Sequence, residues 1–243
     1  MPIIKLDAID STNDFLKQLY KDSPVEDFTI VMANSQTNGK GQMGEKWISD
    51  SGKNLTMSIL VKGTSLHKNS IFDFNIAVAL AILKVLKNCK IPNTTIKWPN
   101  DIMSDSKKVA GILIENILKA DDHYIAIVGI GLNLNQNNFS HLPQATSLAN
   151  ITGEFYELED MAILLKNSLK EQLITLSNNS QKLWDEYHEN LFKINYPSPF
   201  EDKGGKRFMG IIKQVDFNGK LKVLLDEDDS IVYFEVKEVK LLY

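Results

Sequence analysis

Residues 97–101 read Lys97-Trp98-Pro99-Asn100-Asp101, and residues 108–112 read Lys108-Val109-Ala110-Gly111-Ile112. Two lysines and one carboxylate lie here among apolar residues, where an unpaired charge costs on the order of several kcal/mol. Pro99 fixes one backbone angle and restricts Trp98 to an extended conformation. The two segments therefore predict buried structure whose charges need a partner.

A glycine-rich loop precedes these segments at residues 36–44, Gln36-Thr37-Asn38-Gly39-Lys40-Gly41-Gln42-Met43-Gly44. Gly41 and Gly44 permit close backbone approach, successive N–H groups make an anion nest, and Lys40 adds a positive charge. A dinucleotide-binding turn would need a helix directly after the loop, whereas Trp47 and a polar turn follow. A plain surface loop stays open as the alternative. If the fold joins this loop to residues 97–112, the two form a pocket suited to a reacting anion.

The composition is that of an ordinary folded globule. The chain has 243 residues, 43% hydrophobic and 24% charged, which is enough for one large domain or one large and one small. A formal net charge of −4 argues against a general nucleic-acid binder. Cys89 is the single cysteine, which excludes a disulfide scaffold and a cysteine-based metal cluster within one chain. The N-terminus has no apolar signal core and the longest apolar run, residues 76–83, is short, so we expect a cytoplasmic protein that does not enter a membrane.

The spacing of apolar residues predicts an α+β fold. Ser11-Thr12-Asn13-Asp14 is typical of a helix start, with Ser11 as the cap. Apolar residues alternate with polar ones over residues 55–61, as in a half-buried strand. Further strands are expected at residues 28–33, 94–98, 109–114 and 124–134, and helices at residues 71–86, 157–176 and around 184–191.

A change of composition at Asn195-Tyr196-Pro197-Ser198-Pro199 indicates a boundary. We expect a main domain over residues 1–195 and a small all-β domain over residues 200–243. Asn218-Gly219 predicts a type I′ hairpin turn in the small domain. Its strands are expected at residues 208–215, 221–225 and 231–236.

Each charged candidate also has an ordinary explanation. Most lysines are solvated, so Lys97 and Lys108 could be surface residues, and pairs such as Asn100-Asp101 commonly form turns. Asp101 could equally hold Mg²⁺ together with substrate phosphates. The glycines of Gly129-Ile130-Gly131-Leu132-Asn133 indicate either close approach by a ligand or backbone, or a β-bulge.

In their order along the chain, these segments resemble the biotin protein ligase family. The resemblance covers about residues 5–150 and implies the mixed sheet flanked by helices of class II aminoacyl-tRNA synthetases and biotin ligases, followed by a small C-terminal SH3-like β-barrel. The segments that carry it are Ser11-Thr12-Asn13, Gln36 with residues 39–44 and Trp47, Lys97-Trp98-Pro99-Asn100-Asp101, residues 108–115, residues 129–133 and Thr146-Ser147-Leu148.

The resemblance implies an ATP-dependent ligase. Biotin and ATP, with Mg²⁺ as cofactor, would give biotinyl-5′-AMP. A lysine of a biotin carboxyl carrier protein domain, in acetyl-CoA carboxylase or a related carboxylase, would then take the biotinyl group. Bringing a carboxylate against a phosphate crowds like charges, so such a site needs fixed cations and N–H donors.

The resemblance also implies roles for single residues. Lys108 would be catalytic and would lie against the biotin carboxylate and the α-phosphate. The residues implied at biotin are Ser11, Thr12, Asn13, Gln36, Lys40, Gly41, Gln42, Lys108 and Gly111. The residues implied at ATP or the adenylate are Trp47, Lys97, Asn100, Asp101 and Asn133, with Asp101 as the candidate Mg²⁺ ligand.

Two departures from the family pattern bear on function. Many relatives have an arginine-rich glycine loop where this chain has Lys40, Gln42, Met43 and Glu45, so we expect a weaker charge clamp on the intermediate. The chain starts at the catalytic part rather than with a helix-turn-helix domain, so we expect no repressor function and no nucleic-acid partner. A lipoate or octanoyl transferase and a non-catalytic protein that sequesters biotin stay open as alternatives. A homodimer stays open too, because relatives can pair through sheet edges.

Overall fold

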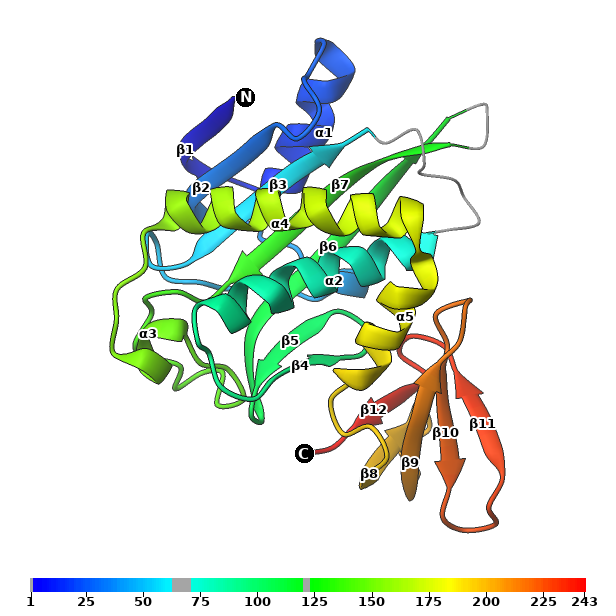
Figure 1. Ribbon diagram of the computed structural model, residues 1–243. Coiled ribbons are helices and arrows are strands. Elements are labelled where there is room, and N and C mark those ends of the chain that lie inside the picture. Colours follow the sequence, from blue (N-terminus) through cyan, green and yellow to red (C-terminus); the bar gives the residue numbers. More distant parts are fainter. Residues whose placement is uncertain (1, 63–70, 120–122) are drawn as a thin grey trace.

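The chain folds around two β-sheets. A computed structural model describes residues 2–62, 71–119 and 123–243 (Figure 1). The larger sheet has the strand order β1-β2-β3-β7-β6-β5-β4. β1 runs parallel to β2, and the other neighbours are antiparallel. The bounds are β1 Ile3–Ile9, β2 Ile30–Gln36, β3 Leu55–Val61, β4 Thr94–Lys97, β5 Asp101–Ser104, β6 Lys107–Leu118 and β7 Tyr124–Leu132.

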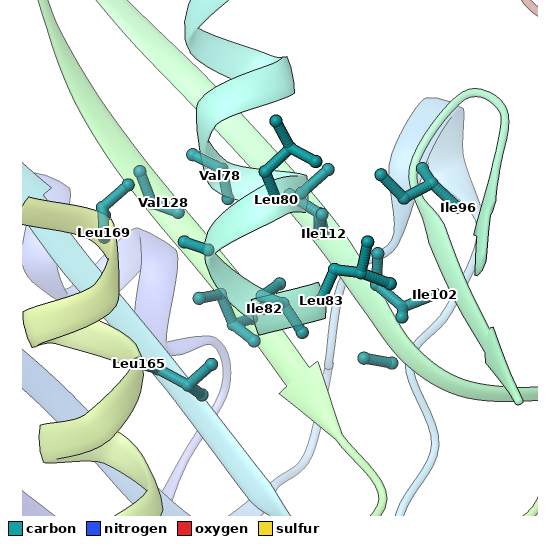
Figure 2. Close-up of a cluster of buried hydrophobic side chains, with 14 of the residues drawn as sticks. Val78, Leu80, Ile82, Leu83, Ile96, Ile102, Ile112, Val128, Leu165 and Leu169 are labelled. Carbon is teal, nitrogen blue, oxygen red and sulfur yellow. The ribbon is translucent and has the colours of Figure 1, made fainter. Parts of the chain in front are cut away.

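Helices cover both faces of this sheet. α2 and α4 lie together on one face, while α1 packs against β2, β3 and β7 on the other (Figure 1). α2 is apolar nearly all round because the strands and α4 enclose it, and Figure 2 shows its Leu80 and Leu83 among their side chains. No helix of the described residues is both long and apolar enough to cross a bilayer. The bounds are α1 Thr12–Asp22, α2 Ile71–Asn88, α3 Leu148–Thr152, α4 Leu158–Asn178 and α5 Ser180–Glu189, with a 3₁₀ turn, η1, at Gln42–Gly44.

β3 differs from the half-buried strand predicted at residues 55–61. All of its residues are buried, including the polar Thr56 and Ser58. The Ser58 hydroxyl lies 2.8 Å from Thr12 Oγ1 and 2.6 Å from Asn13 Oδ1, both at the start of α1. The alternating pattern correctly predicted a strand. Its prediction that the polar face is exposed to solvent was wrong, because α1 covers that face.

The C-terminal residues form the smaller sheet, whose strands are all antiparallel in the order β11-β10-β9-β8-β12. The sequence pattern does not predict β8, which contains Pro197 and Pro199, or β12, which has only three residues. The described pairings place β11 and β12 at opposite ends, so the small sheet is established and its SH3-like barrel form stays a prediction. The bounds are β8 Pro197–Asp202, β9 Arg207–Val215, β10 Leu221–Leu225, β11 Ile231–Phe234 and β12 Val239–Leu241.

The β9–β10 connection is a hairpin, but the predicted type I′ turn is wrong. That type needs a positive φ at both Asn218 and Gly219, and of these two only Gly219 has one, at 84°. Gly219 N donates to Asp216 O (2.8 Å), and the Asp216 carboxylate accepts from Asn218 N and Lys220 N (2.9 Å each). The Asp216 side chain therefore stabilises a longer loop in which a left-handed glycine follows a tight turn.

The two sheets share a continuous core. Trp98 Nε1 donates to Gly219 O (2.9 Å), and the Phe217 ring packs edge-on against Trp184 of α5 with centroids 4.9 Å apart. Buried residues of both sheets, such as Ile96 and Val223, belong to one apolar cluster. The division into domains over residues 1–195 and 200–243 stays a prediction, and the second sheet begins at Pro197. The hairpin of the small sheet thus docks on the segment 97–101.

Candidate functional site

A cavity of about 550 Å³ lies between the large sheet, the glycine loop and the C-terminal sheet. Its size is in the range of small-molecule sites. The structure brings together at this cavity every predicted site residue except Asn133. Those that line it are Ser11, Thr12, Asn13, Gln36, Lys40, Gly41, Gln42, Trp47, Lys97, Asn100, Asp101, Lys108 and Gly111.

Asp101 lies between two lysines in this cavity. Lys108 Nζ is 2.6 Å from Asp101 Oδ1, and Lys97 Nζ is 3.9 Å from Asp101 Oδ2. Burial lowers the pKa of Lys97, while the charge of Asp101 opposes that shift and the charge of Lys240 adds to it. Two ammonium groups thus share one carboxylate in a partly desolvated place, which favours binding of an anion.

An irregularity in the pairing of β5 with β6 aims Lys108 at Asp101. Asp101 pairs with Gly111 on this ladder. Met103, two residues along β5, pairs with Lys108, where a regular register would place Val109. Because side chains alternate between the two faces of a strand, the bulge puts Lys108 on the face of Asp101.

The indole of Trp47 lies against β6 and β7 where glycines leave room for it. A Cβ at Gly131 would be 2.3 Å from Trp47 Cε2, and a Cβ at Gly111 would be 3.0 Å from Trp47 Cζ3. β7 pairs in regular register on both sides here, so these glycines reflect close approach of a side chain and not a bulge. Lys108 Nζ lies 5.4 Å from the ring centroid. Trp47 Nε1 is buried and has no hydrogen-bond partner among the described residues, which leaves a donor for a ligand.

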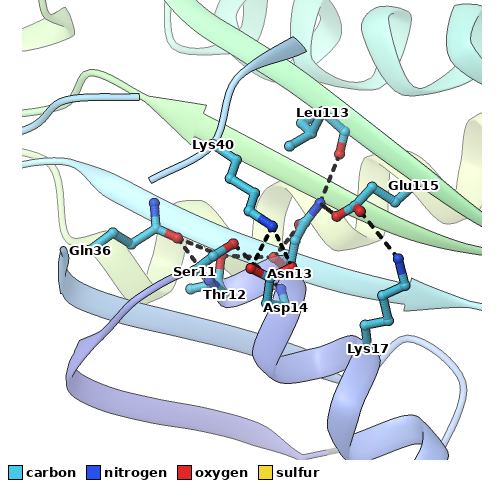
Figure 3. Close-up of polar contacts among 10 residues, drawn as sticks. Ser11, Thr12, Asn13, Asp14, Lys17, Gln36, Lys40, Leu113 and Glu115 are labelled. Carbon is cyan, nitrogen blue, oxygen red and sulfur yellow. Dashed lines mark hydrogen bonds and ion pairs between the residues drawn. The ribbon is translucent and has the colours of Figure 1, made fainter. Parts of the chain in front are cut away.

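The start of α1 and Gln36 form a polar end of the cavity (Figure 3). Gln36 Oε1 accepts from Thr12 N (2.8 Å) and from Thr12 Oγ1 (3.1 Å). Ser11 caps the helix, and Asn13 Nδ2 donates to Glu115 Oε2 (2.9 Å). These bonds hold hydroxyl and amide groups in fixed positions toward a polar ligand.

Lys40, the cation of the glycine loop, points to α1. Its Nζ lies 2.8 Å from Asp14 Oδ1 and 2.6 Å from Asp14 Oδ2, and this hydrogen bond raises the pKa of Lys40 (Figure 3). The loop itself is a narrow hairpin in which Gly41 N donates to Glu45 O (2.7 Å). Because Asp14 already pairs with the ammonium, the implied closure of Lys40 over a ligand stays a prediction.

Asn100 and Asn133 bond to backbone groups. Asn100 Nδ2 donates to Ile112 O (2.8 Å), which fastens the β4–β5 turn to β6. Asn133 is buried, and its Nδ2 donates to Thr146 O (3.1 Å), while Thr146 N donates to Lys108 O (3.0 Å). In this arrangement Asn133 supports the backbone of Lys108 from outside the cavity lining, and its implied nucleotide contact stays a prediction.

The C-terminal sheet adds cavity residues that the sequence did not single out. Lys203, Lys237 and Lys240 line the cavity, and the Tyr243 ring lies 4.7 Å from Lys97 Nζ. Burial, together with the charge of Asp101, raises the pKa of Tyr243. No sequence pattern separates these lysines from the solvated lysines of other surfaces.

The described residues form no ready-made metal site at the cavity. Within residues 2–62, 71–119 and 123–243, no three His, Cys, Asp or Glu side chains are placed to bind a metal. Asp101 offers one carboxylate, which two ammonium groups already engage. Mg²⁺ therefore stays a prediction, as an ion carried in by the phosphates of a nucleotide.

Residues 6–133, more than half of the 243, match the model of the biotin/lipoate A/B protein ligase family. The chain belongs to this family. Its matches include the bifunctional ligase/repressor BirA of Bacillus spizizenii, with 33% identity over 157 residues, 63% of this chain and 47% of that protein. Another is the biotin–[acetyl-CoA-carboxylase] ligase of Mycobacterium tuberculosis, with 27% identity over 198 residues, 80% of this chain and 73% of that protein.

This member of the biotin/lipoate ligase family spans about half the length of the first of these relatives. Its fold is shared with the biotin protein ligase of Aquifex aeolicus, solved in complex with biotin and ATP. That match has a TM-score of 0.77 and 24% identity and covers 99% of this chain and 98% of the other. The similarity extends over both sheets.

Proposed function

We propose that the protein is an ATP-dependent biotin ligase, which joins biotin to AMP and transfers the biotinyl group to a lysine of a biotin carboxyl carrier protein domain. The observation that carries this proposal is that one cavity has an uncharged polar end and a charged end. One end has the polar groups of Ser11, Thr12 and Gln36, and the other has Lys108, Asp101 and Lys97. Membership of the family and the names of the relatives support it.

In the first step, a carboxylate oxygen of biotin attacks the α-phosphorus of ATP. The bond from that phosphorus to the oxygen bridging to the β-phosphorus breaks, and pyrophosphate leaves. Two anions must meet, so Lys108 and Lys97 would offset their repulsion at fixed positions. The Lys108 side chain is 31% exposed and can turn from Asp101 to the ligand.

In the second step, the neutral amine of the acceptor lysine attacks the acyl carbon of biotinyl-5′-AMP. The bond from the acyl carbon to the phosphate oxygen breaks, AMP leaves with the electron pair, and the amine loses a proton. Lys108 would stabilise the negative charge that gathers on the acyl and phosphate oxygens. The same ammonium thus serves both steps.

The polar end of the cavity matches the ureido group of biotin, which has one carbonyl acceptor and two N–H donors. Ser11 and Thr12 supply hydroxyls and Gln36 supplies an amide. The indole of Trp47 would cover the ligand from the side of the glycine loop, with its unpartnered Nε1 as a donor. A lipoyl group has no ureido group to bind there.

The test is transfer to an acceptor. The protein is mixed with Mg-ATP, an apo carrier domain, and either biotin or lipoate, and the mass of the carrier domain is measured. We expect the mass to rise by one biotinyl group and to stay unchanged with lipoate. Transfer of lipoate alone would make the protein a lipoate ligase, and tight biotin binding without transfer would make it a sequestering protein.

A further inference from the structure

A lysine of the C-terminal sheet contacts the glycine loop. Lys237, in the turn between β11 and β12, has its Nζ 2.6 Å from Met43 O, to which it donates, and 3.9 Å from Glu45 Oε1. Lys237, Met43 and Glu45 are exposed, and all three line the cavity. The contact therefore lies at the rim of the cavity and links the loop to the second sheet.

Two lysine side chains hold the loop, one near its start and one at its tip. Near its start, Lys40 is paired with Asp14 of α1. At its tip, Met43 adopts a left-handed conformation (φ 55°) and is 60% exposed as a residue. Its carbonyl oxygen is directed to Lys237. The loop contains no arginine, since Arg207 is the single arginine of the chain. The positive charge that contacts the tip at Met43 O is that of Lys237, which belongs to the C-terminal sheet.

The turn that carries Lys237 is itself well fixed. Glu238 N donates to Glu235 O (3.1 Å), and Glu235 N donates to Glu238 Oε2 (2.9 Å). The second of these bonds lowers the pKa of Glu238. Lys203 N also donates to Glu238 O (3.0 Å), which ties the turn to the end of β8. The ammonium of Lys237 is therefore presented to the loop from a rigid base.

We propose that Lys237 is a positioning residue that holds the glycine loop over the cavity and slows the escape of the acyl-adenylate before an acceptor lysine arrives. The role in retention rests on the proposed function, whereas the hold on the loop does not. Because an exposed pair contributes little energy, its loss should change the opening of the loop about two- to five-fold and not abolish closure.

The first experiment measures the loop directly and needs no catalysis. Amide hydrogen exchange of residues 38–47 is compared among the wild-type protein, Lys237→Ala, Lys237→Arg and Lys213→Ala. Lys213 is an exposed lysine of β9 in the same sheet and serves as the matched control. We expect about two- to five-fold faster exchange in Lys237→Ala only. Wild-type exchange of the loop in Lys237→Ala overturns the proposal.

The second experiment measures retention. Each protein is given labelled biotin and Mg-ATP without acceptor, and free and bound adenylate are separated by rapid filtration. We expect the ratio of free to bound adenylate to rise in Lys237→Ala and to return in Lys237→Arg. An equal ratio in all four proteins overturns the role in retention. If the wild-type protein forms no adenylate, the proposed function fails, and the exchange experiment still decides whether Lys237 holds the loop.

Discussion

At the scale of single residues, Lys108 is the group on which the proposed chemistry depends most directly. Replacing it by alanine removes the ammonium that would meet both the carboxylate and the α-phosphate. We expect Lys108→Ala to lower biotin-dependent exchange of pyrophosphate into ATP by at least about 100-fold. Lys107→Ala is the matched control, because the exposed Lys107 bonds to Pro143 O and does not line the cavity. Near wild-type exchange in Lys108→Ala would refute the role.

Lys97 combines a cost in stability with a use in binding. Its pKa is lowered from 10.5 mainly by burial, so between the lowered value and 10.5 the unfolded chain binds more protons than the folded protein. In that range the stability of the wild-type protein rises with pH relative to a variant without the ammonium. We expect Lys97→Met to be more stable than the wild-type protein at pH 7, to lose this advantage at higher pH, and to raise the KM for ATP.

Urea unfolding at pH 7 and pH 10.5 checks the expectation for Lys97, with Lys213→Met as an exposed control. The same difference in unfolding free energy at both pH values would count against the buried ammonium as its cause. An unchanged KM for ATP in Lys97→Met would contradict the role of Lys97 in ATP binding.

The sequence identified some cavity residues and missed others for a physical reason. The place of Lys108 at the site could be predicted because apolar and small residues follow it. A charge beside a buried segment is costly unless a partner or a ligand pairs with it. Lys237 and Lys240 lie in exposed positions of the C-terminal sheet, where lysine is common. Their place at the cavity results from how the two sheets dock, and no local pattern encodes that.

At the scale of elements, β6 and β7 shape the cavity through glycines that admit Trp47. Gly131→Ala would place a Cβ 2.3 Å from Trp47 Cε2, so the rigid ring must move. Gly111→Ala would meet Trp47 Cζ3 at 3.0 Å and Lys108 Nζ at 3.1 Å, and the end of the lysine can give way. We expect Gly131→Ala to destabilise the protein by about 1–3 kcal/mol and to weaken biotin binding more than Gly111→Ala. Calorimetric titration measures biotin binding, and urea unfolding measures stability. Equal effects of Gly131→Ala and Gly111→Ala would show that Trp47 is free to shift.

Helices and strands were predictable from the sequence where one face of the element, or every face, is buried. α2 follows from a segment that is apolar on nearly every side, α4 follows from apolar residues at helical spacing, and β7 follows from a mostly apolar run. β3 was correct in position but its polar residues bond to α1, which lies elsewhere in the sequence. β8 was missed because its prolines are typical of a boundary. In the sheet Pro197 and Pro199 pair with β9, whereas β12 pairs only with residues 200–202 of β8.

At the scale of the whole molecule, the cavity is complete only when the sheets are docked. The large sheet brings Lys97 and Lys108, and the C-terminal sheet brings Lys240 and Tyr243 to the same place. The docking contact is a hairpin whose Gly219 accepts from Trp98 Nε1 in the segment 97–101. A change that weakens the docking of the C-terminal sheet on the large sheet should therefore also weaken the binding of ATP.

Gly219→Ala tests this coupling. Gly219 has φ +84°, and a Cβ there would be 2.5 Å from Phe72 Cδ2 of α2, so the hairpin must move away from Trp98. Gly205 has nearly the same φ, +82°, but a Cβ there meets nothing within 4 Å, so Gly205→Ala carries the backbone strain alone, about 1 kcal/mol. We expect Gly219→Ala to lose a further 1–3 kcal/mol or so in urea unfolding and to raise the KM for ATP several-fold, with a smaller change for biotin. If Gly205→Ala and Gly219→Ala behave alike in both measurements, the docked hairpin does not place Lys240 and Tyr243, and the cavity of the large sheet is sufficient by itself.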